Sequence, residues 1–161
     1  MQRNKKTISN TKKLALSGIV IALYIIIMFF TQSFAFGQYQ VRAATSLYAL
    51  AAIHPFLILP LGIANFLSNT IMGGLGSFDM FGGLAVGLIT AFLCHMARKI
   101  NAAWVAAPII AGPALIVPLW LQYLTGVPYW ALVLSLGIGQ VIPGILGFLI
   151  VKYLEKPLLK I

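Results

Sequence analysis

AATSLYALAAIHPFLILPLGIANFLSNTIM, residues 43 to 72, is a predominantly apolar stretch of 30 residues. As one α-helix it would measure about 45 Å, whereas the hydrocarbon core of a bilayer is about 30 Å thick. Proline disfavours helical geometry in the residue before it, and glycine accepts turn conformations. His54-Pro55 and the segment Pro60 to Gly62 are therefore two places where the chain can turn. Length alone does not choose between one long helix and two short ones.

The composition of the whole chain defines its class. Of 161 residues, 61% are hydrophobic and 8% are charged, whereas about 25% of the residues in soluble domains are charged. The composition predicts an all-α integral membrane protein. Each membrane span uses about 20 residues, which leaves no room for a soluble catalytic domain. The single cysteine, Cys94, lies in an apolar run, so we expect neither a disulfide nor a cysteine metal site.

Four further spans are expected outside residues 43–72, at Leu14 to Phe36, Phe78 to Ala97, Ala102 to Leu124 and Pro128 to Leu154. Proline recurs every five residues in the third of these, at Pro108, Pro113 and Pro118. Proline removes a helical hydrogen bond and bends the helix. The sequence therefore predicts a kinked span there. Residues 1–13 and 155–161 are predicted to be basic tails on either side of a transmembrane domain at 14–154.

Charge chooses between the alternatives for residues 43–72, because Lys and Arg accumulate in short cytoplasmic loops. If the stretch forms two helices, the chain has six spans with both termini in the cytoplasm. Ten of the 11 basic residues are then cytoplasmic and Arg42 alone is outside. If it forms one helix, five basic residues lie in the N-terminal tail and six lie outside. We therefore predict a bundle of six transmembrane helices.

The two short helices must then tilt, pack inside the bundle, or begin earlier, near Gln38 or Gln40. The formal net charge of +9 is interpreted as topology and contact with anionic lipid, not as a nucleic-acid interface.

Arg42 and Asp79 are expected at the same outer end of the bundle, Arg42 between the first two spans and Asp79 in the loop before the fourth. They could form an ion pair with each other. Alternatively, Asp79 caps a helix while Arg42 reaches the lipid headgroups. A third interpretation is a polar site open to the exterior, because polar groups at membrane depth are costly unless they face a cavity or a partner. Asn65 and Asn69 lie four residues apart on one helical face and could join helices or line a pocket.

Other polar and aromatic residues carry similar alternatives. Tyr123, Tyr129 and Trp130 form either an interfacial aromatic belt or a stacking platform for a flat heterocycle. Gln140, near the middle of the last span, could bind a ligand or cross-link helices. The glycine-rich segment from Gly73 to Gly83 does not have the spacing of a phosphate-binding loop and is interpreted as a flexible outer gate.

No pattern in the sequence supports catalysis. The membrane body has no paired carboxylates, no HExxH motif and no serine–histidine arrangement, and His54 and His95 are predicted to be structural. The middle of every span lacks an ionisable residue, so a proton-coupled carrier is disfavoured and the energy for transport would come from elsewhere. The small residues Ala15, Gly18 and Ala22 in the first span allow close approach of a helix, either within the protein or from a partner.

Four segments resemble the QueT family, the proposed queuosine-precursor transporters and substrate-binding S components of energy-coupling factor (ECF) importers. They are QVRAATSLYALAAIHPF (Gln40 to Phe56), PLGIANFLSN (Pro60 to Asn69), GGLGSFDMFGGLAVGLITAF (Gly73 to Phe92) and YLTGVPYW (Tyr123 to Trp130). Many QueT-like sequences have an acidic residue shortly after the arginine, in a segment that reads roughly R-x-x-E-A-L. The matching residue here is Thr45.

The resemblance implies a protein of the prokaryotic plasma membrane that captures a queuosine precursor, queuine or a related deazaguanine, from outside. It implies a transmembrane coupling protein and two ABC-type ATPases as partners, and no cofactor. Arg42 would then bind a carbonyl or ring nitrogen of the ligand, and Asp79 and Asn69 would bind groups on its edge. Tyr123, Tyr129 or Trp130 would stack on it. The alternatives are an S component for another vitamin or heterocycle, a stand-alone channel or carrier, and a structural or regulatory protein without a ligand.

Overall fold

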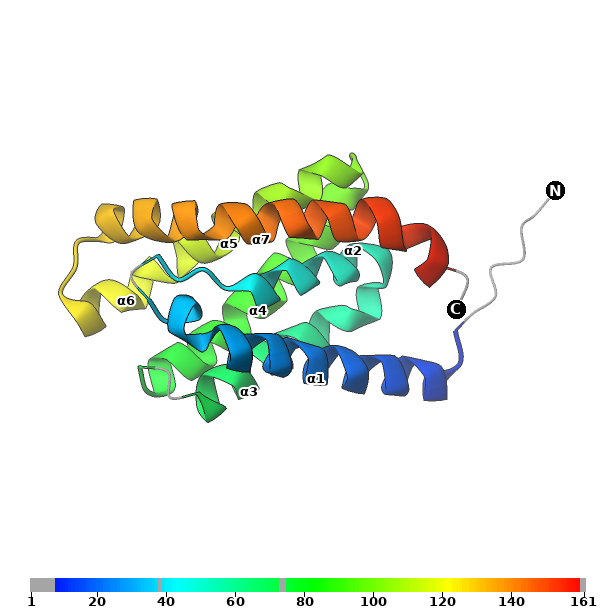
Figure 1. Ribbon diagram of the computed structural model, residues 1–161, viewed down its shortest axis with the longest axis horizontal. Helices are drawn as coiled ribbons and strands as arrows, with labels where there is room; N and C mark the ends of the chain where they lie inside the picture. Colours follow the sequence, from blue (N-terminus) through cyan, green and yellow to red (C-terminus); the bar gives the residue numbers. More distant parts are fainter. Residues whose placement is uncertain (1–7, 38, 73–74, 160–161) are drawn as a thin grey trace.

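A computed structural model of the chain describes residues 8–37, 39–72 and 75–159, and the elements that it contains are all helices. Figure 1 shows them in chain order. Their bounds are α1 Asn10–Ala35, the 3-10 helix η1 Ala43–Ala49 continued by α2 Leu50–Ile53, η2 Pro55–Leu57 continued by α3 Ile58–Ile71, α4 Ser77–Arg98, η3 Ala102–Val105 continued by α5 Ala106–Ile116, α6 Pro118–Thr125, and α7 Tyr129–Leu158.

These elements make six helical segments, as the sequence predicts. Four are long and apolar enough to cross a membrane, and they cover residues 10–35, 77–98, 102–125 and 129–158. The other two, residues 43–53 and 55–71, are shorter. The observed α1 and α7 extend beyond the predicted first and last spans, which were expected to begin at Leu14 and end at Leu154. The oxygen of Ser9 caps α1 by accepting a hydrogen bond from the backbone N–H of Lys12.

The apolar stretch of residues 43–72 is split at His54-Pro55. His54 has an extended backbone with φ −127° and ψ 96°, and Pro55 begins the next helix. This is the effect of a proline ring on the residue before it. The prediction of a second possible turn at Pro60 to Gly62 is wrong, because these residues lie inside α3. Pro60 is tolerated there because it lies in the first helical turn, where the backbone N–H needs no partner within the helix.

Gly62 serves helix packing rather than a turn. A Cβ atom at Gly62 would lie 2.6 Å from the side chain of Leu88, and one at Gly87 would lie 3.0 Å from the Cα of Gly62. The two glycines thus allow the backbones of α3 and α4 to approach closely. Small residues have this role in membrane bundles, where helix association depends on close van der Waals contact.

The proline-rich span, where the sequence predicts a kink, is interrupted. The span is divided into α5 and α6, with Pro113 inside α5 and Pro118 as the first residue of α6. Pro118 provides no backbone N–H to continue the preceding ladder. The short α6 then ends at Thr125, and the next residue, Gly126, has a left-handed φ of 71°.

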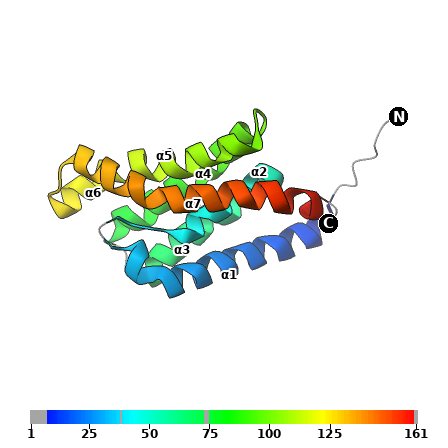
Figure 2. The ribbon, with the colours of Figure 1, turned by 45° about the horizontal axis from the view of Figure 1, so that its top comes forward.

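The short segment of η1 and α2 lies in the centre of the bundle. All residues from Ala44 to Ile53 are buried, and the segment contacts α1, α4 and α7. Figure 2 shows this segment between the outer helices, with α1 and α5 on opposite sides. The segment therefore packs inside the bundle, one of the solutions open to a short helix. It does not begin near Gln40, because helical structure starts only at Ala43; Gln38 lies outside the described residues.

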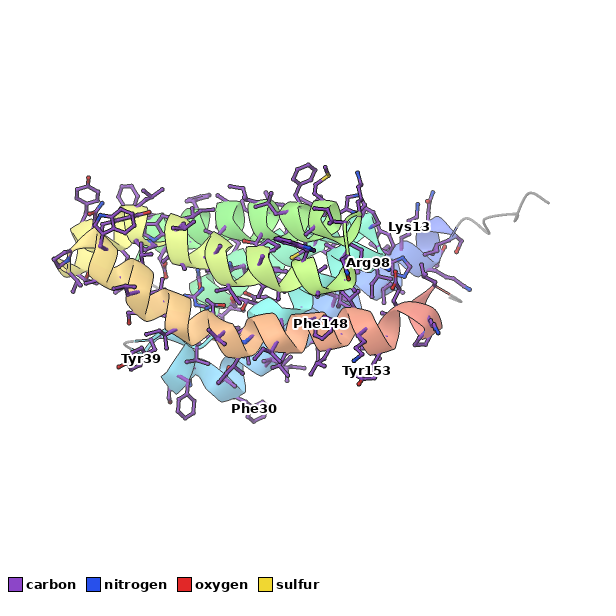
Figure 3. All side chains as sticks on the ribbon, turned by 90° about the horizontal axis from the view of Figure 1, so that it is seen from above. Lys13, Phe30, Tyr39, Arg98, Phe148 and Tyr153 are labelled. Atoms are coloured by element: carbon purple, nitrogen blue, oxygen red, sulfur yellow. The ribbon has the colours of Figure 1, made fainter. Side chains whose placement is uncertain are left out.

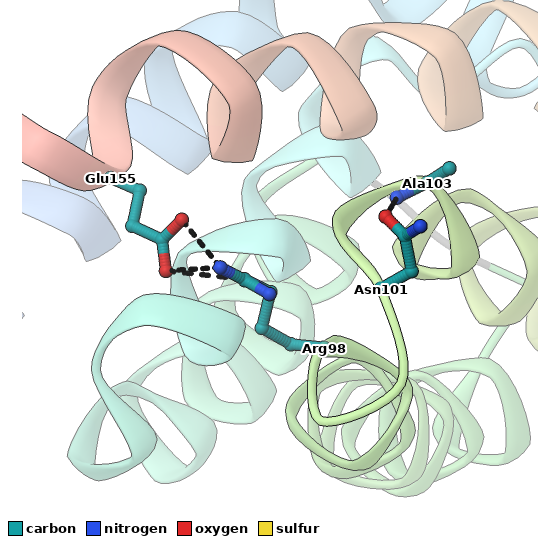
Figure 4. A network of polar contacts seen from close by, with 4 residues as sticks. All are labelled: Arg98, Asn101, Ala103 and Glu155. Carbon is teal, nitrogen blue, oxygen red and sulfur yellow. Dashed lines mark hydrogen bonds and ion pairs between the residues drawn. The ribbon is translucent and has the colours of Figure 1, made fainter.

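The two described chain ends lie at the same end of the bundle (Figure 1). Figure 3 shows Lys13 and Arg98 toward this end and Tyr39 toward the other. Figure 4 shows that the guanidinium of Arg98, on α4, binds both carboxylate oxygens of Glu155 on α7, with Nη2 to oxygen distances of 2.7 Å. Within the described ranges this is the only salt bridge. It joins α4 and α7 at the end of the bundle where both described chain ends lie, called the terminal end below.

Candidate functional site

Arg42 is placed by a sharp return of the chain between α1 and η1. The backbone N–H of Val41 donates to the carbonyl of Phe34 at 3.0 Å, and Gln40 has a φ of 44°. Positive φ is uncommon for a residue other than glycine, so this turn is held by its surroundings. It directs Arg42 into the bundle, where only 6% of the residue is exposed.

The buried guanidinium of Arg42 has neutral partners. Its Nε donates to the carbonyl of Ala35 and its Nη1 to Oδ1 of Asn65, both at 3.4 Å. Its Cζ lies 5.0 Å from the centre of the Phe36 ring. No ion pair joins Arg42 to Asp79 in the part of the chain that the structure describes. A buried cation held only by long hydrogen bonds and a ring face retains unused capacity to bind an electron-rich group.

Asn65 connects this guanidinium to two other helices. Its Nδ2 donates to the hydroxyl of Tyr48 and to the carbonyl of Gly83, each at 2.8 Å. The three contacts occupy both ends of the amide and fix its orientation. Asn65 therefore joins helices and lines the site at once.

Asp79 and Asn69 form the other polar part of the site. Asp79 lies in the first turn of α4, not in the loop before it, and the positive end of the helix dipole favours a carboxylate there. Its Oδ1 accepts a hydrogen bond from the indole N–H of Trp120 at 3.3 Å. Asn69 Nδ2 donates to the backbone carbonyl of Asp79 at 2.9 Å, while the buried Asn69 Oδ1 has no hydrogen-bond partner among the described residues.

Gln140 joins α7 to the returning chain. Its Nε2 donates to the carbonyl of Gln40 at 3.0 Å, and its Oε1 lies 2.8 Å from Oγ1 of Thr45. Thr45 Oγ1 also lies 2.7 Å from the carbonyl of Arg42. Thr45, which replaces the acid of the family pattern, thus binds protein groups. The hydrogen bond from Gln140 to the carbonyl of Gln40 needs Gly139, because a Cβ atom there would overlap the carbonyl oxygen of Tyr39.

One nearly enclosed cavity brings together five of the predicted site residues. They are Arg42, Asn65, Asn69, Asp79 and Gln140. The space open to the centre of a water molecule is about 10 Å³, which is room for about one water. The cavity, as the structure has it, therefore has no room for a bicyclic molecule.

The three outer aromatic residues do not line this cavity. Tyr123 and Trp130 are 82% and 70% exposed. The hydroxyl of Tyr129 donates to the carbonyl of Leu115 at 2.9 Å, and its ring packs edge-on against Trp130. These positions fit an interfacial belt, whereas the tryptophan in the cavity wall is Trp120.

Sequence reasoning also missed Tyr48, Thr45 and Gln40 as lining residues. A signal for two of them exists, because Arg42, Thr45 and Tyr48 are spaced by three. In a 3-10 helix, residues three apart lie on the same face. The expected flexible gate from Gly73 to Gly83 is helical from Ser77 onward, and residues 73–74 lie outside the described ranges.

The three small residues of α1 form an outward face of that helix. Ala15, Gly18 and Ala22 are exposed, and a Cβ atom at Gly18 would meet nothing within 4 Å. The buried side of α1 instead presents Tyr24 and Met28 to the bundle. The small residues therefore do not pack inside the monomer.

An all-helical apolar bundle in which four of the described helices are long and apolar enough to cross a membrane is typical of a multi-pass membrane protein. The model of the QueT transporter family matches residues 14–156. The chain belongs to the QueT transporter family and is a membrane transporter. No curated protein and no solved structure matches it.

Proposed function

We propose that the protein is the substrate-binding S component of an ECF importer and that it captures a queuosine precursor, queuine or a related deazaguanine. The observation that carries the proposal is the chemistry of the cavity. Arg42 offers N–H donors, whereas Asp79 and the unpaired Asn69 Oδ1 offer acceptors. A deazaguanine has a carbonyl on one part of its rim and N–H and amino donors on another. Such a ligand satisfies both sets of groups.

The proposed orientation places both termini in the cytoplasm and the cavity near the outer surface. Six of the basic residues that the structure describes lie in or next to the ends of α1, α4 and α7: Lys12, Lys13, Arg98, Lys99, Lys152 and Lys156. Arg42 instead directly precedes η1. The rule that basic residues stay inside favours this orientation.

In this proposal the chain itself only binds and releases the ligand. A transmembrane coupling protein and two ABC-type ATPases supply the energy, and the S component topples in the membrane to release the ligand inside. The outward face of Ala15, Gly18 and Ala22 is the proposed contact with the coupling protein, because small side chains let a partner helix approach closely.

The first test is a ligand panel with the detergent-purified protein. We expect the unfolding temperature to rise with the concentration of queuine or of a deazaguanine precursor. At a ligand concentration of 100 times Kd, binding adds about 2.7 kcal/mol to the free energy of unfolding. Vitamins provide the comparison set. Tryptophan fluorescence should respond through Trp120 in the cavity wall, so Trp120→Phe is the matched control for the optical signal. Stabilisation by a vitamin instead would contradict the proposed substrate, and silence across the panel would contradict a binding function.

For the partner face, we expect Gly18→Leu to abolish co-purification with the coupling protein while ligand affinity and thermal stability stay unchanged. The added side chain enters open space in the isolated protein but would hold a partner helix away. Ala22→Leu should act in the same way, and Ile19→Leu, at a neighbouring exposed position that is already large, is the control. Undiminished co-purification of Gly18→Leu would remove this face from the interface.

A further inference from the structure

Two buried tyrosines form a chain of hydroxyl contacts that ends at the cavity. The hydroxyls of Tyr24 on α1 and Tyr48 on η1 lie 3.2 Å apart, and neither residue has exposed surface. Tyr48 also lines the cavity and accepts a hydrogen bond from Asn65 Nδ2 at 2.8 Å. Because Asn65 Oδ1 accepts from Arg42, the amide cannot be reversed without losing that contact. The nitrogen therefore faces Tyr48 and donates to it.

The positions of the two hydroxyl hydrogens follow from this arrangement. Each hydroxyl has one hydrogen, and the contact between them uses only one of the two. If Tyr48 donated to Tyr24, the hydrogen of Tyr24 would have no acceptor among the described residues. A buried donor without a partner is costly. If Tyr24 donates to Tyr48, the two lone pairs of Tyr48 are used and its own hydrogen is left for a group in the cavity that Tyr48 lines.

We infer that the Tyr48 hydroxyl is a second ligand-binding donor beside Arg42, and that Tyr24 is a positioning residue that fixes its direction. The inference rests on the proposed function and deepens it. Asn65 contacts both Arg42 and Tyr48, so the two donors are neighbours. The acceptors, Asp79 and Asn69 Oδ1, belong to the start of α4 and to the next turn of α3. The ligand class is thus a flat heterocycle with a hydrogen-bond acceptor on the rim that faces Arg42 and Tyr48 and N–H donors elsewhere.

The test uses phenylalanine substitutions, which keep the packed rings and remove only the hydroxyl. We expect Tyr48→Phe to weaken binding of 7-deazaguanine about tenfold, the value of one neutral hydrogen bond at the upper end of its range. Tyr24→Phe should weaken binding less, and the double variant should match Tyr48→Phe because Tyr24 acts through Tyr48. Tyr153→Phe, at an exposed tyrosine near the terminal end, is the control.

A second measurement separates ligand contact from loss of structure. Wild type should prefer 7-deazaguanine over 2-amino-7-deazapurine, which lacks the ring carbonyl, and Tyr48→Phe should reduce that preference. A merely structural role would weaken both ligands equally. Tyr24→Phe provides the same comparison if Tyr48→Phe fails to fold, because it removes the hydroxyl that orients Tyr48.

The possible failures differ. If wild type binds no member of the panel, the proposed function falls and this inference falls with it. If wild type binds 7-deazaguanine and Tyr48→Phe binds it equally well with the same preference, only the role of Tyr48 is overturned. If the effects of Tyr24→Phe and Tyr48→Phe add, Tyr24 is not a positioning residue.

Discussion

Arg42→Ala should lower ligand affinity by about 100-fold or more while the protein still folds. A hydrogen bond to a charged group contributes about 1.5–3 kcal/mol, and loss of one partner of a buried charged contact costs about 2–5 kcal/mol. Each 1.4 kcal/mol is a factor of ten in Kd. The fold should tolerate the change because the buried guanidinium has no carboxylate partner in the described structure, so its removal leaves no buried charge unpaired. Calorimetric titration measures the affinity, and size-exclusion chromatography with circular dichroism measures folding.

Two companion variants make the Arg42 result specific. Arg42→Lys keeps the charge but loses the planar fork, so its affinity should lie between those of wild type and Arg42→Ala. Arg98→Ala removes a guanidinium at the terminal end, where it binds Glu155, and should leave the affinity unchanged. Wild-type affinity in Arg42→Ala would exclude the guanidinium from the ligand contacts.

Gly139→Ala should weaken binding more than tenfold and lower the unfolding temperature. The added Cβ would overlap the carbonyl oxygen of Tyr39, a backbone atom that cannot rotate away. Overpacking of this kind costs about 1–3 kcal/mol. Relief requires the returning chain to move off α7, which would break the bond from Gln140 to the carbonyl of Gln40 and displace Arg42.

Gly137→Ala is the matched control for this prediction, because it lies on the same helix and its new Cβ would approach only the Cβ of Ala114, at 3.9 Å. Thermal unfolding and ligand titration of the two variants measure the effect side by side. If Gly139→Ala behaves like Gly137→Ala, the contact of the backbone at residues 39–40 with α7 does not hold the site in place.

The six-helix fold could be predicted because strong physical constraints act on this sequence. A 30-residue apolar helix exceeds the bilayer, His54-Pro55 offers a break, and the basic residues then fall on one side. The second candidate turn shows the limit of such reasoning. Proline and glycine at residues 60–62 have the composition of a turn, but the role of Gly62 depends on Leu88 and Gly87 of another helix. A single sequence does not show that contact.

The polar half of the site was also predictable, because a buried polar side chain in a membrane protein needs a partner or a cavity. The aromatic half was not. Trp120 lines the cavity, whereas Trp130 is exposed. Both are tryptophans at the outer end of the bundle, so the residue type does not tell them apart. Tyr48 was missed because its segment was expected to be an α-helix. With 3.6 residues per turn, residues 42 and 48 diverge, whereas the observed 3-10 geometry aligns them.

If the chain captures a bicyclic ligand as proposed, the small size of the cavity also has a consequence for the kinetics of uptake. A space that holds about one water must open before a bicyclic ligand can enter. The ligand then encounters a competent protein only during the fraction of time that the cavity is open, and its apparent Kd is the intrinsic Kd divided by that fraction. In that case capture would be limited by the opening of the cavity rather than by diffusion. The observed association rate would therefore reach a plateau, set by the protein, as the external nutrient becomes abundant.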